Sequence, residues 1–286
     1  MDAKRLCKFC IEKRDDCHTF LISPKVEQGW LEWFGIERNK AFSQLSPYAS
    51  KLSDLDGRDS FYWHMLLWDP QKNSLIGGQR FQFINETNKP GPDESYLEYC
   101  YPGLAEQMLA ASKCYVEVGR TFLMPPYQGK SWLKELIRGF VRIPEKQDFK
   151  YLLGMVSFNH LALNQLVIDY FLAALNTCQF RGSLPISKPR HAYPTGNPTK
   201  ALAWNQIDLP SLTAMLKEID QSFEMPLVLG PYRSLCSVKY EGVSIASSYN
   251  QILQLLFSGR TDLLTTRQKS RLPPYPSFQG ALGGSA

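Results

Sequence analysis

The segment YVEVGRTF, residues 115–122, places a carboxylate and a guanidinium three positions apart, with a glycine between them. In a regular strand Glu117 and Arg120 would lie on opposite faces of the sheet, because side chains alternate between the two faces. A β-bulge centred on Gly119 would insert an extra residue and could bring both side chains to one face, beside backbone N–H groups released from strand pairing. The spacing therefore predicts a polar site at a break in a strand.

Acyl transfer is the chemistry that this arrangement would suit. Released N–H groups can stabilise the charge that develops on a thioester carbonyl oxygen, with a contribution of about 3 kcal/mol per donor. Glu117 could accept the proton of an attacking amine. A structural ion pair between Glu117 and Arg120 is the alternative, because such pairs also concentrate on half-buried sheets. The two residues alone leave both interpretations open.

Other charged residues could hold an amino-acid substrate. Arg80 could bind its carboxylate, and the acidic run of Asp54, Asp56 and Asp59 could bind its amine. Each of these residues could also be an ordinary solvated charge. The segment LSDLDGRDS equally fits a surface turn.

The turn YQGK, residues 127–130, precedes a segment that we expect to be helical, and free N–H groups at a helix start favour an anionic donor group. Basic residues recur at every fourth position of this segment, at Lys130, Lys134, Arg138 and Arg142. Like charges at this spacing repel by about 0.2–0.5 kcal/mol per pair, so an acidic partner would relieve a standing cost. The stripe could dock an acidic carrier protein, and a solvated helix face is the alternative.

Two other kinds of chemistry find little support. A covalent hydrolase-like mechanism is not supported, because no G-x-S-x-G elbow occurs. Nor does a Ser or Cys stand at motif spacing from His64, His160 or His191. A C-x-x-C pair occurs within a group of four potential zinc ligands, Cys7, Cys10, Cys17 and His18, but the spacing does not fit a zinc finger. We expect no metal site and a direct attack of the amine on the thioester.

The apolar patterns predict an α/β (α+β) fold. The expected elements before residue 113 are a strand at 4–12, a helical stretch within 25–50 broken at Gly29 and Gly35, a hairpin at 61–69 and 75–84, a loop at 85–95 and a short helix ending near Ser112.

The segment 113–158 predicts strand, turn, helix and strand, with the helix stopped by Pro144 and a second helix starting at Leu161. Consecutive strand, helix and strand imply parallel pairing with a right-handed crossover. Beyond residue 178 we expect a proline-rich loop at 184–200, a helix at SLTAMLKEID and a strand at LCSVKYEGVSIA.

Length and composition favour one domain, residues 1–270, followed by a flexible tail, residues 271–286. The formal net charge of +5 is too mild to indicate nucleic acid, but it is compatible with an acidic partner or an anionic lipid surface. The start of the chain has no signal-peptide core. The 7 cysteines of the whole chain fit reduced thiols better than a disulfide framework. We expect a cytoplasmic protein, with peripheral contact to the inner membrane as an option.

The motifs resemble those of GNAT-type acyltransferases that use acyl carriers. This group includes ornithine N-acyltransferases, N-acyl amino acid synthases and acyl-homoserine lactone synthases. The resemblance covers residues 38–260 and rests on an R-x-x-x-F entry at Arg38 and Phe42, an acidic stretch around Asp56 and Asp59, HMLLWD with GGQRF, YVEVGRTFLMPPYQG followed by YLLGMVSF, and the later PLVLGPYRSLCSVKYEG.

The resemblance implies a GNAT-like fold: a mixed, largely antiparallel central sheet with a parallel strand-helix-strand crossover, flanked by helices. It implies catalytic positions at Arg80, Glu117 and Arg120, with Asp56 and Asp59 in amine recognition or closure of an N-terminal lid. The donor arm would lie between strands 113–123 and 150–157. The implied substrate-binding positions are Asp56, Asp59, Phe122, Leu123, Gln128, Gly129, Lys130, Ser157 and Phe158, and the acyl tunnel would use Met155, Phe158 or Trp132.

Relatives that use acetyl-CoA have a turn with a second glycine or alanine, whereas residues 128–133 here, QGKSWL, supply only one glycine. We therefore expect an acyl carrier protein as donor in preference to CoA, and no permanently bound cofactor. The expected function is transfer of a fatty acyl group to the amine of an amino acid or a related acceptor. The alternatives are an acyl-homoserine lactone-type synthase, an acetyl-CoA-dependent N-acetyltransferase and a non-catalytic carrier-binding module.

Overall fold

The computed structural model describes residues 6–263 except 25, 44–52, 130, 143–148, 178, 195–206, 227–228, 236 and 248–250. Lys130, Pro144 and the expected tail at 271–286 therefore lie outside the described residues, as does part of the proline-rich loop.

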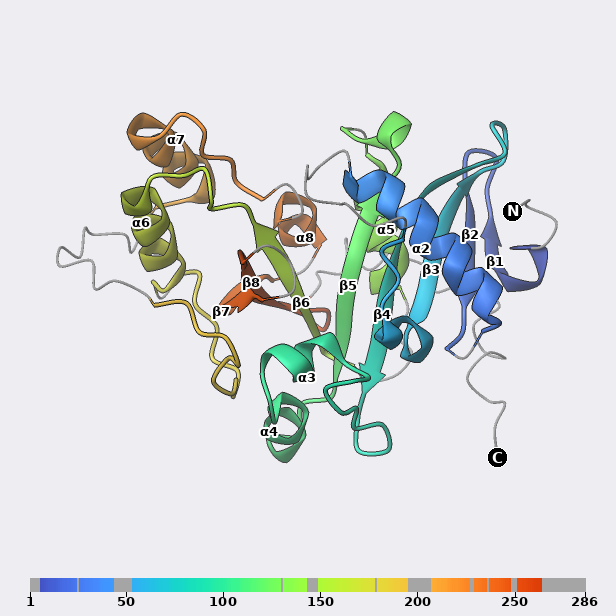
Figure 1. The fold of residues 1–286 in the computed structure, drawn as a ribbon, viewed down its shortest axis with the longest axis horizontal. Coiled ribbons are helices and arrows are strands. Elements are labelled where there is room, and N and C mark those ends of the chain that lie inside the picture. Colours follow the sequence, from blue (N-terminus) through green and yellow to red (C-terminus); the bar gives the residue numbers. More distant parts are fainter. Residues whose placement is uncertain are drawn as a thin grey trace.

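One sheet of eight strands forms the centre of the molecule (Figure 1). Its order is β1 (Cys10–Lys13), β2 (His18–Ile22), β3 (Trp63–Asp69), β4 (Ser74–Ile84), β5 (Tyr115–Leu123), β6 (Tyr151–Phe158), β8 (Ile252–Arg260) and β7 (Lys239–Ala246). Strands β5 and β6 are parallel, and every other adjacent pair is antiparallel. The predicted mixed, largely antiparallel sheet is confirmed.

Strands β5 and β6 pair only along their first halves, from Tyr115–Tyr151 to Val118–Gly154. Gly154 permits the last pair, because a Cβ there would lie 3.0 Å from the carbonyl oxygen of Val118. Beyond this point, within the described strands, β5 stays paired with β4 and β6 with β8, but the register between β5 and β6 ends. Figure 1 shows the two strands diverging, so the sheet is open at its centre.

Helices cover both faces of the sheet. One face carries α2 (Gln28–Ser43), α3 (Tyr96–Cys100) and α4 (Leu104–Ala110), and the other carries α5 (Trp132–Val141), α6 (Gln165–Leu175), α7 (Leu209–Ile219) and α8 (Leu229–Leu235). Neighbouring residues of β5 illustrate the division, because Tyr115 packs with α3 and α4 whereas Val116 packs with α5. The remaining elements are the short 3-10 helices η1 (Cys7–Phe9), η2 (Gly57–Phe61) and η3 (Pro125–Tyr127).

Two apolar clusters lie toward the two ends of the sheet, and a third spans its centre, where Ile84 and Tyr115 pack with Leu153 and Leu256. Phe81, Val116 and Val118 pack with Leu136 and Ile137 of α5 at the β2–β5 end. At the other end, a second cluster joins α6 and α7 to β6, β7 and β8, through residues that include Phe158, Phe171, Leu212, Tyr240 and Leu255. No helix among the described residues is both long enough and apolar enough to cross a membrane.

The hairpin predicted at 61–84 is confirmed by β3 and β4, and the strand, turn, helix and strand of 113–158 by β5, η3, α5 and β6. The predicted breaks at Gly29 and Gly35 are wrong, because α2 includes Gly29 in its first turn and continues through Gly35. This glycine instead allows a close approach, since a Cβ there would overlap the side chains of Ser53 and Leu55. The prediction also missed β2, β8 and α8, and β1 begins later than expected, after η1.

Gly77 in β4 gives a test of the close packing beside the opening. A methyl group at this position would overlap the carbonyl oxygen of Phe122 in β5. We expect Gly77→Ala to lower the free energy of unfolding by about 1–3 kcal/mol, as overpacking does. Gly29→Ala is the control, because it lies in α2 with open space around it and should raise stability by up to about 1 kcal/mol. Urea denaturation of both variants measures the difference, and equal stabilities would contradict the packing argument.

Candidate functional site

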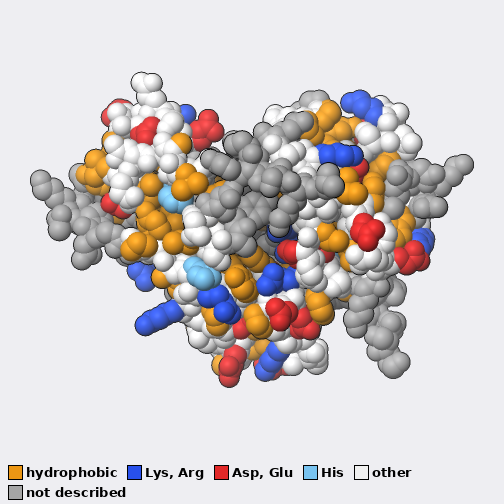
Figure 2. Space-filling model, viewed as in Figure 1, with side chains coloured by type: hydrophobic (Ala, Val, Ile, Leu, Met, Phe, Trp, Pro, Cys, Tyr) orange, Lys and Arg blue, Asp and Glu red, His pale blue; other side chains and the backbone are white. Residues whose placement is uncertain are grey.

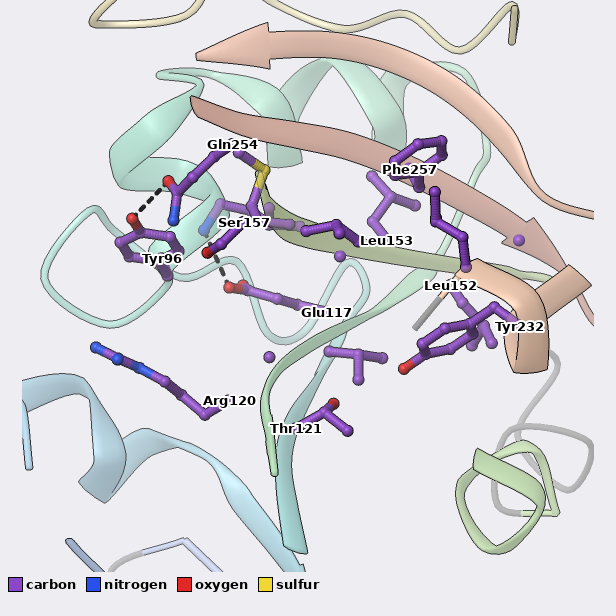
Figure 3. Close-up of a pocket in the computed structure, with 18 of the residues that line it drawn as sticks. Tyr96, Glu117, Arg120, Thr121, Leu152, Leu153, Ser157, Tyr232, Gln254 and Phe257 are labelled. Atoms are coloured by element: carbon purple, nitrogen blue, oxygen red, sulfur yellow. Dashed lines mark hydrogen bonds between the residues drawn. The ribbon is translucent and has the colours of Figure 1, made fainter. Parts of the chain in front are cut away.

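A cavity of about 430 Å³ fills the opening between β5 and β6 (Figure 3). Its apolar part is lined by side chains that include Leu152, Leu153, Met155, Val156, Val238 and Phe257. In Figure 3 the labelled residues Leu152, Phe257 and Tyr232 lie at one end, and Tyr96, Gln254, Glu117 and Arg120 lie toward the other. The cavity therefore has an apolar end near α8 and a polar end near α3.

Glu117 is buried at the polar end, with 3% of its surface exposed. Its Oε1 accepts hydrogen bonds from the Tyr62 hydroxyl at 2.5 Å and the Leu97 N–H at 3.0 Å. Its Oε2 accepts one from the Ser95 hydroxyl at 2.6 Å. Burial raises the pKa of Glu117 above its ordinary value, although these hydrogen bonds and the charge of Arg80 act in the opposite direction.

The expected bulge is present in β5. Gly78 pairs with Phe122 and Arg80 with Gly119, so β5 has one more residue than β4 between these two pairs. The sequence placed the unusual backbone at Gly119, but the left-handed residue is Arg120, with φ +52°. A non-glycine residue rarely adopts this conformation, which costs on the order of 1 kcal/mol unless its surroundings hold it there.

Arg120 is held by a closed ring of ion pairs in which three arginines alternate with three aspartates. Each aspartate bridges two arginines, and all six N–O distances lie between 2.6 and 3.3 Å. In order around it, this Arg–Asp ring consists of Arg38, Asp54, Arg120, Asp56, Arg80 and Asp59.

The Arg–Asp ring joins four parts of the chain. Arg38 comes from α2, Arg80 from β4 and Arg120 from β5, and the aspartates come from η2 and the segment just before it. Arg38 and Asp59 have no exposed surface, and Arg80 has 2%. Although burial acts to raise it, hydrogen bonds from Arg38 and the charge of Arg80 hold the pKa of Asp59 well below its usual range. Three guanidinium groups alternate with three carboxylates, so the formal charges of the ring cancel.

This pairing changes the roles expected for several residues. Arg80 lines the cavity, but its Nη1 atom binds Asp56 and Asp59, and its guanidinium stacks 4.4 Å from the centre of the Tyr62 ring. Neither Asp56 nor Asp59 is among the residues that line the cavity. Recognition of an amine does not fit that position, whereas fixing the N-terminal helix to the sheet does.

Other expected substrate contacts divide into two groups. Ser157 lines the cavity and is exposed, and Met155 lines it as expected for the tunnel. Phe158 instead packs against Phe171, with ring centres 4.9 Å apart, and Trp132 packs against Tyr127, with ring centres 6.1 Å apart. These two residues therefore belong to the core and do not form the tunnel.

The same correction applies to the end of β5. Phe122 packs against the rings of Phe34 and Phe42 from α2, and Leu123 belongs to the core beneath α5. Neither lines the cavity, because beyond the bulge their side chains fill the two faces of the sheet. Phe42 lines it instead.

The turn after β5 is ordered by its own side chain, because Gln128 Nε2 donates to the carbonyl oxygen of Leu123 at 3.0 Å. Gly129 follows with φ +72°. Both residues are placed as the sequence suggested, between β5 and α5.

The basic stripe expected along α5 does not form one free face. Arg142 is buried and binds both carboxylate oxygens of Glu12 in β1, at 2.9 and 3.0 Å. Arg138 binds Glu135 at 2.5 Å, and Lys134 is half-buried. Every fourth residue advances by about 40° around a helix, so the stripe turns toward β1 before it ends. An acidic partner is not needed to neutralise Arg138 or Arg142.

Sequence reasoning missed four residues that shape the polar end: Tyr62, Ser95, Tyr96 and Gln254. The Tyr96 hydroxyl donates to Gln254 Oε1 at 2.7 Å, and this bond orients the amide. Figure 3 shows the amide nitrogen of Gln254 turned toward the cavity. Tyr62 and Tyr96 flank segments already singled out, but Gln254 lies in an unpredicted strand and carried no signal.

Residues 38–138 match the acetyltransferase (GNAT) domain family. The matched stretch contains the whole Arg–Asp ring and Glu117. The match identifies the fold as GNAT and the class of reaction as acyl transfer. Comparison with curated protein sequences finds no significant match.

Similar solved structures include the CoA-dependent acyl-homoserine lactone synthase BjaI, at 11% identity and TM-score 0.42, over 88% of this chain and 85% of that one. FeeM, an N-acyl amino acid synthase from uncultured soil microbes, matches at 14% identity and TM-score 0.34, over 60% and 86%. Spermidine N-acetyltransferase from Vibrio cholerae matches at 11% identity and TM-score 0.39, over 85% of this chain and 96% of that one. These similarities are too low to carry a functional argument.

His64 makes the stability of this site depend on pH. Burial lowers the pKa of His64 from 6.5 to about 4, although Asp59 acts in the opposite direction. Its Nε2–H donates to the carbonyl oxygen of Asp59 at 2.8 Å. Because the pKa of His64 is lower in the folded state than in the unfolded state, the contribution of neutral His64 to the free energy of unfolding is complete above pH 6.5. It is lost as the pH falls toward 4. The histidine should contribute a slope of up to about 1.4 kcal/mol per pH unit in this window.

We expect His64→Gln to flatten the decline in the free energy of unfolding between pH 6.5 and 4, because glutamine does not titrate. Urea denaturation at a series of pH values measures this slope. His18→Gln, at a half-buried position of β2, is the control. A slope that His64→Gln leaves unchanged would assign the pH dependence to other groups.

Proposed function

We propose that the protein is an N-acyltransferase that moves a fatty acyl group from a carrier thioester to the amine of an amino acid or a related acceptor. The observation that carries this proposal is the cavity at the parted strands, which joins an apolar pocket to a buried carboxylate. Its volume lies in the range of pockets that enclose small ligands. The apolar end suits an acyl chain, and the polar end suits the reacting groups.

Glu117 is the proposed general base. Its three hydrogen-bond donors fix both carboxylate oxygens, and burial raises its pKa, which makes it a stronger base than an exposed glutamate. It would accept a proton from the attacking amine, directly or through one water molecule. The free amine would then attack the thioester carbon, and the thiol of the carrier would leave as the amide forms.

The bulge in β5 supports stabilisation of the tetrahedral intermediate. The cavity is lined by Gly119, Arg120 and Thr121 of β5, which follow the last residue of this strand that pairs with β6, Val118. Backbone N–H groups on that edge could donate to the developing oxyanion, a contribution of about 3 kcal/mol for each donor. Arg120 would add positive charge beside them, although the Arg–Asp ring as a whole is neutral.

The donor is proposed to be an acyl carrier protein, with CoA as the alternative. The support is the sequence of the turn after β5, where Gly129 is the only glycine before α5. With one glycine, this turn would offer fewer backbone N–H groups to the pyrophosphate of CoA. The charges of α5 add little support, because Arg138 and Arg142 already have carboxylate partners.

Replacement of the proposed base tests the function. We expect Glu117→Gln to reduce acyl transfer by at least about 100-fold, in keeping with the usual contribution of a positioned base. The amide is nearly isosteric with the carboxylate, and the Ser95 hydroxyl can rotate to accept a hydrogen bond from it. The fold should therefore persist. Mass spectrometry of metabolites from bacteria that express either form measures the product, and new N-acyl amino acids should occur only with the unmodified chain.

Glu98→Gln is the matched control, because Glu98 binds the N–H groups of Gly103 and Ala105 and does not line the cavity. It should leave the products unchanged. Full activity of Glu117→Gln would exclude the proposed base. Identical extracts from the unmodified chain and from cells without it would argue for the non-catalytic alternative.

The length of the acyl chain should depend on Met155, which lines the cavity. Met155→Trp would fill part of the apolar end, so we expect the preferred acyl group to become shorter by several carbons while the KM for the amine is retained. Assays with acyl carriers of increasing chain length measure the shift. Met215→Trp is the control, since Met215 is also half-buried but packs in the core of α7. The same chain-length profile in both variants would contradict the assignment of the apolar end.

A further inference from the structure

A second group of cationic side chains lies outside the Arg–Asp ring, around Tyr99 of α3. Arg58 of η2 and Arg190 of the loop before β7 each place a guanidinium carbon 4.9 Å from the centre of the Tyr99 ring. The two carbons are thus separated by at most twice that distance. In the space-filling view, Lys and Arg side chains gather around the position of α3 (Figure 2). We call Arg58, Tyr99 and Arg190 the Arg–Tyr–Arg cluster.

Within the described part of the chain, each guanidinium group is anchored through one of its nitrogens. Arg58 Nε donates to the carbonyl oxygen of Pro92, and Arg190 Nε donates to that of Tyr99, both at 2.9 Å. The backbone of Arg190 is fixed as well, because its N–H donates to the carbonyl oxygen of Cys100 at 2.8 Å. No acidic side chain in the described part of the chain forms an ion pair with either arginine. The described residues thus leave the terminal nitrogens of both arginines available for a ligand.

The chemistry of the Arg–Tyr–Arg cluster favours an anion with two or more oxygens. The terminal nitrogens of a guanidinium form a fork that matches a carboxylate or a phosphate. The face of Tyr99 supports both cations and limits their motion. Both charges also reach the Cys100 thiol: burial raises its pKa to about 12, but Arg58 and Arg190 act to lower it. Two cations held near each other carry a repulsion that an anion would relieve.

The cluster adjoins the polar end of the cavity. Tyr96, which lines the cavity, stacks on Tyr99 with ring centres 6.3 Å apart and an interplanar angle of 22°. Arg58 lies 6.0 Å from the centre of the Tyr96 ring. A ligand whose amine reaches Glu117 could therefore extend past Tyr96 toward the two arginines.

The position on the sheet assigns the anion to the acceptor and not to the donor. The Arg–Tyr–Arg cluster lies beside α3, whereas the turn at Gln128 and Gly129 that would receive the donor's phosphate leads into α5 on the opposite face. The charge of Arg80 is already balanced by Asp56 and Asp59, which both bind its Nη1 atom.

We propose that Arg58 and Arg190 bind an anionic group, a carboxylate or a phosphate, of the amine acceptor. This inference rests on the proposed N-acyl transfer. It limits the acceptors to amines that carry a negative charge on the side remote from the reacting nitrogen.

Acyl transfer with pairs of acceptors tests the proposal and distinguishes the two anions. The common amino acids are compared with their carboxamides, and phosphoethanolamine with ethanolamine, with an acyl carrier protein loaded with one fatty acid as donor. We expect the charged member of one pair to be preferred by about 10-fold or more, the effect of a charge-assisted hydrogen bond. The pair that shows the preference identifies the anion.

Three variants assign the preference to the cluster. Arg58→Gln and Arg190→Gln should each raise the KM for the charged acceptor by about 10-fold, with kcat and the KM for the donor unchanged. The double variant should accept the charged and neutral members of a pair equally. Lys188→Gln is the matched control, since Lys188 is exposed in the same loop as Arg190 but is not part of the cluster. Thermal unfolding of each variant confirms that it is folded.

Failure of the subsite and failure of the proposed function give different results. Equal transfer to the charged and neutral amines by the unmodified chain would overturn the subsite and leave N-acyl transfer intact. If no amine is acylated, the proposed function fails, and calorimetric binding of N-dodecanoylglycine and of its methyl ester decides the subsite. Tighter binding of the free acid, lost in the double variant, would support it. Equal binding of acid and ester would overturn it.

Discussion

The Arg–Asp ring is the interaction on which the rest of the site depends. Four of its six charged side chains are buried and the other two are partly exposed, and a buried charge costs several kcal/mol unless it is paired and hydrogen-bonded. The closed alternation satisfies this condition, because every aspartate contacts two arginines and every arginine two aspartates. Loss of one member would leave an uncompensated charge, at a cost of about 3–5 kcal/mol for a buried pair.

The ring also accounts for the unusual backbone of β5. Arg120 has a left-handed conformation at the bulge, and its guanidinium is fixed by Asp54 and Asp56. The bulge then sets where β5 continues after Glu117 and leaves an edge of the strand facing the cavity. Strain at one residue is thus balanced by ion pairs with residues far away in the sequence. The same pairing makes Asp59 a positioning residue and balances the charge of Arg80, which lines the cavity.

The sequence was sufficient for the parts of the fold that have a strong local signal. The alternation at 61–84 predicted the hairpin, and the order of elements at 113–158 predicted the parallel pair. The strand β8 was missed because its run of apolar residues, ILQLLF, lacks the alternation of a half-buried strand. It is covered on both faces, because Leu255 packs beneath α6 and α7 and Leu256 packs beneath α3 and α4.

Sequence reasoning singled out most residues of the site but could not determine their partners. Glu117 and Arg120 attracted attention as a pair, yet Glu117 contacts Tyr62 and Ser95, and Arg120 contacts aspartates more than 60 positions away. Arg142 was assigned to a docking surface because nothing local indicated Glu12, 130 positions earlier. Spacing identifies charged groups that lie near each other in the chain, whereas neutralisation depends on contacts that only the fold creates.

The short pairing between β5 and β6 has a mechanical consequence. Only four pairs of residues connect the two strands by backbone pairing. Side chains strengthen the same stretch on both faces, because Leu152 of β6 belongs to the core beneath α5 and Leu153 packs beneath α3 and α4. Any adjustment in the width of the cavity therefore falls on the unpaired second halves of the two strands, as in a hinge that is fixed at one end.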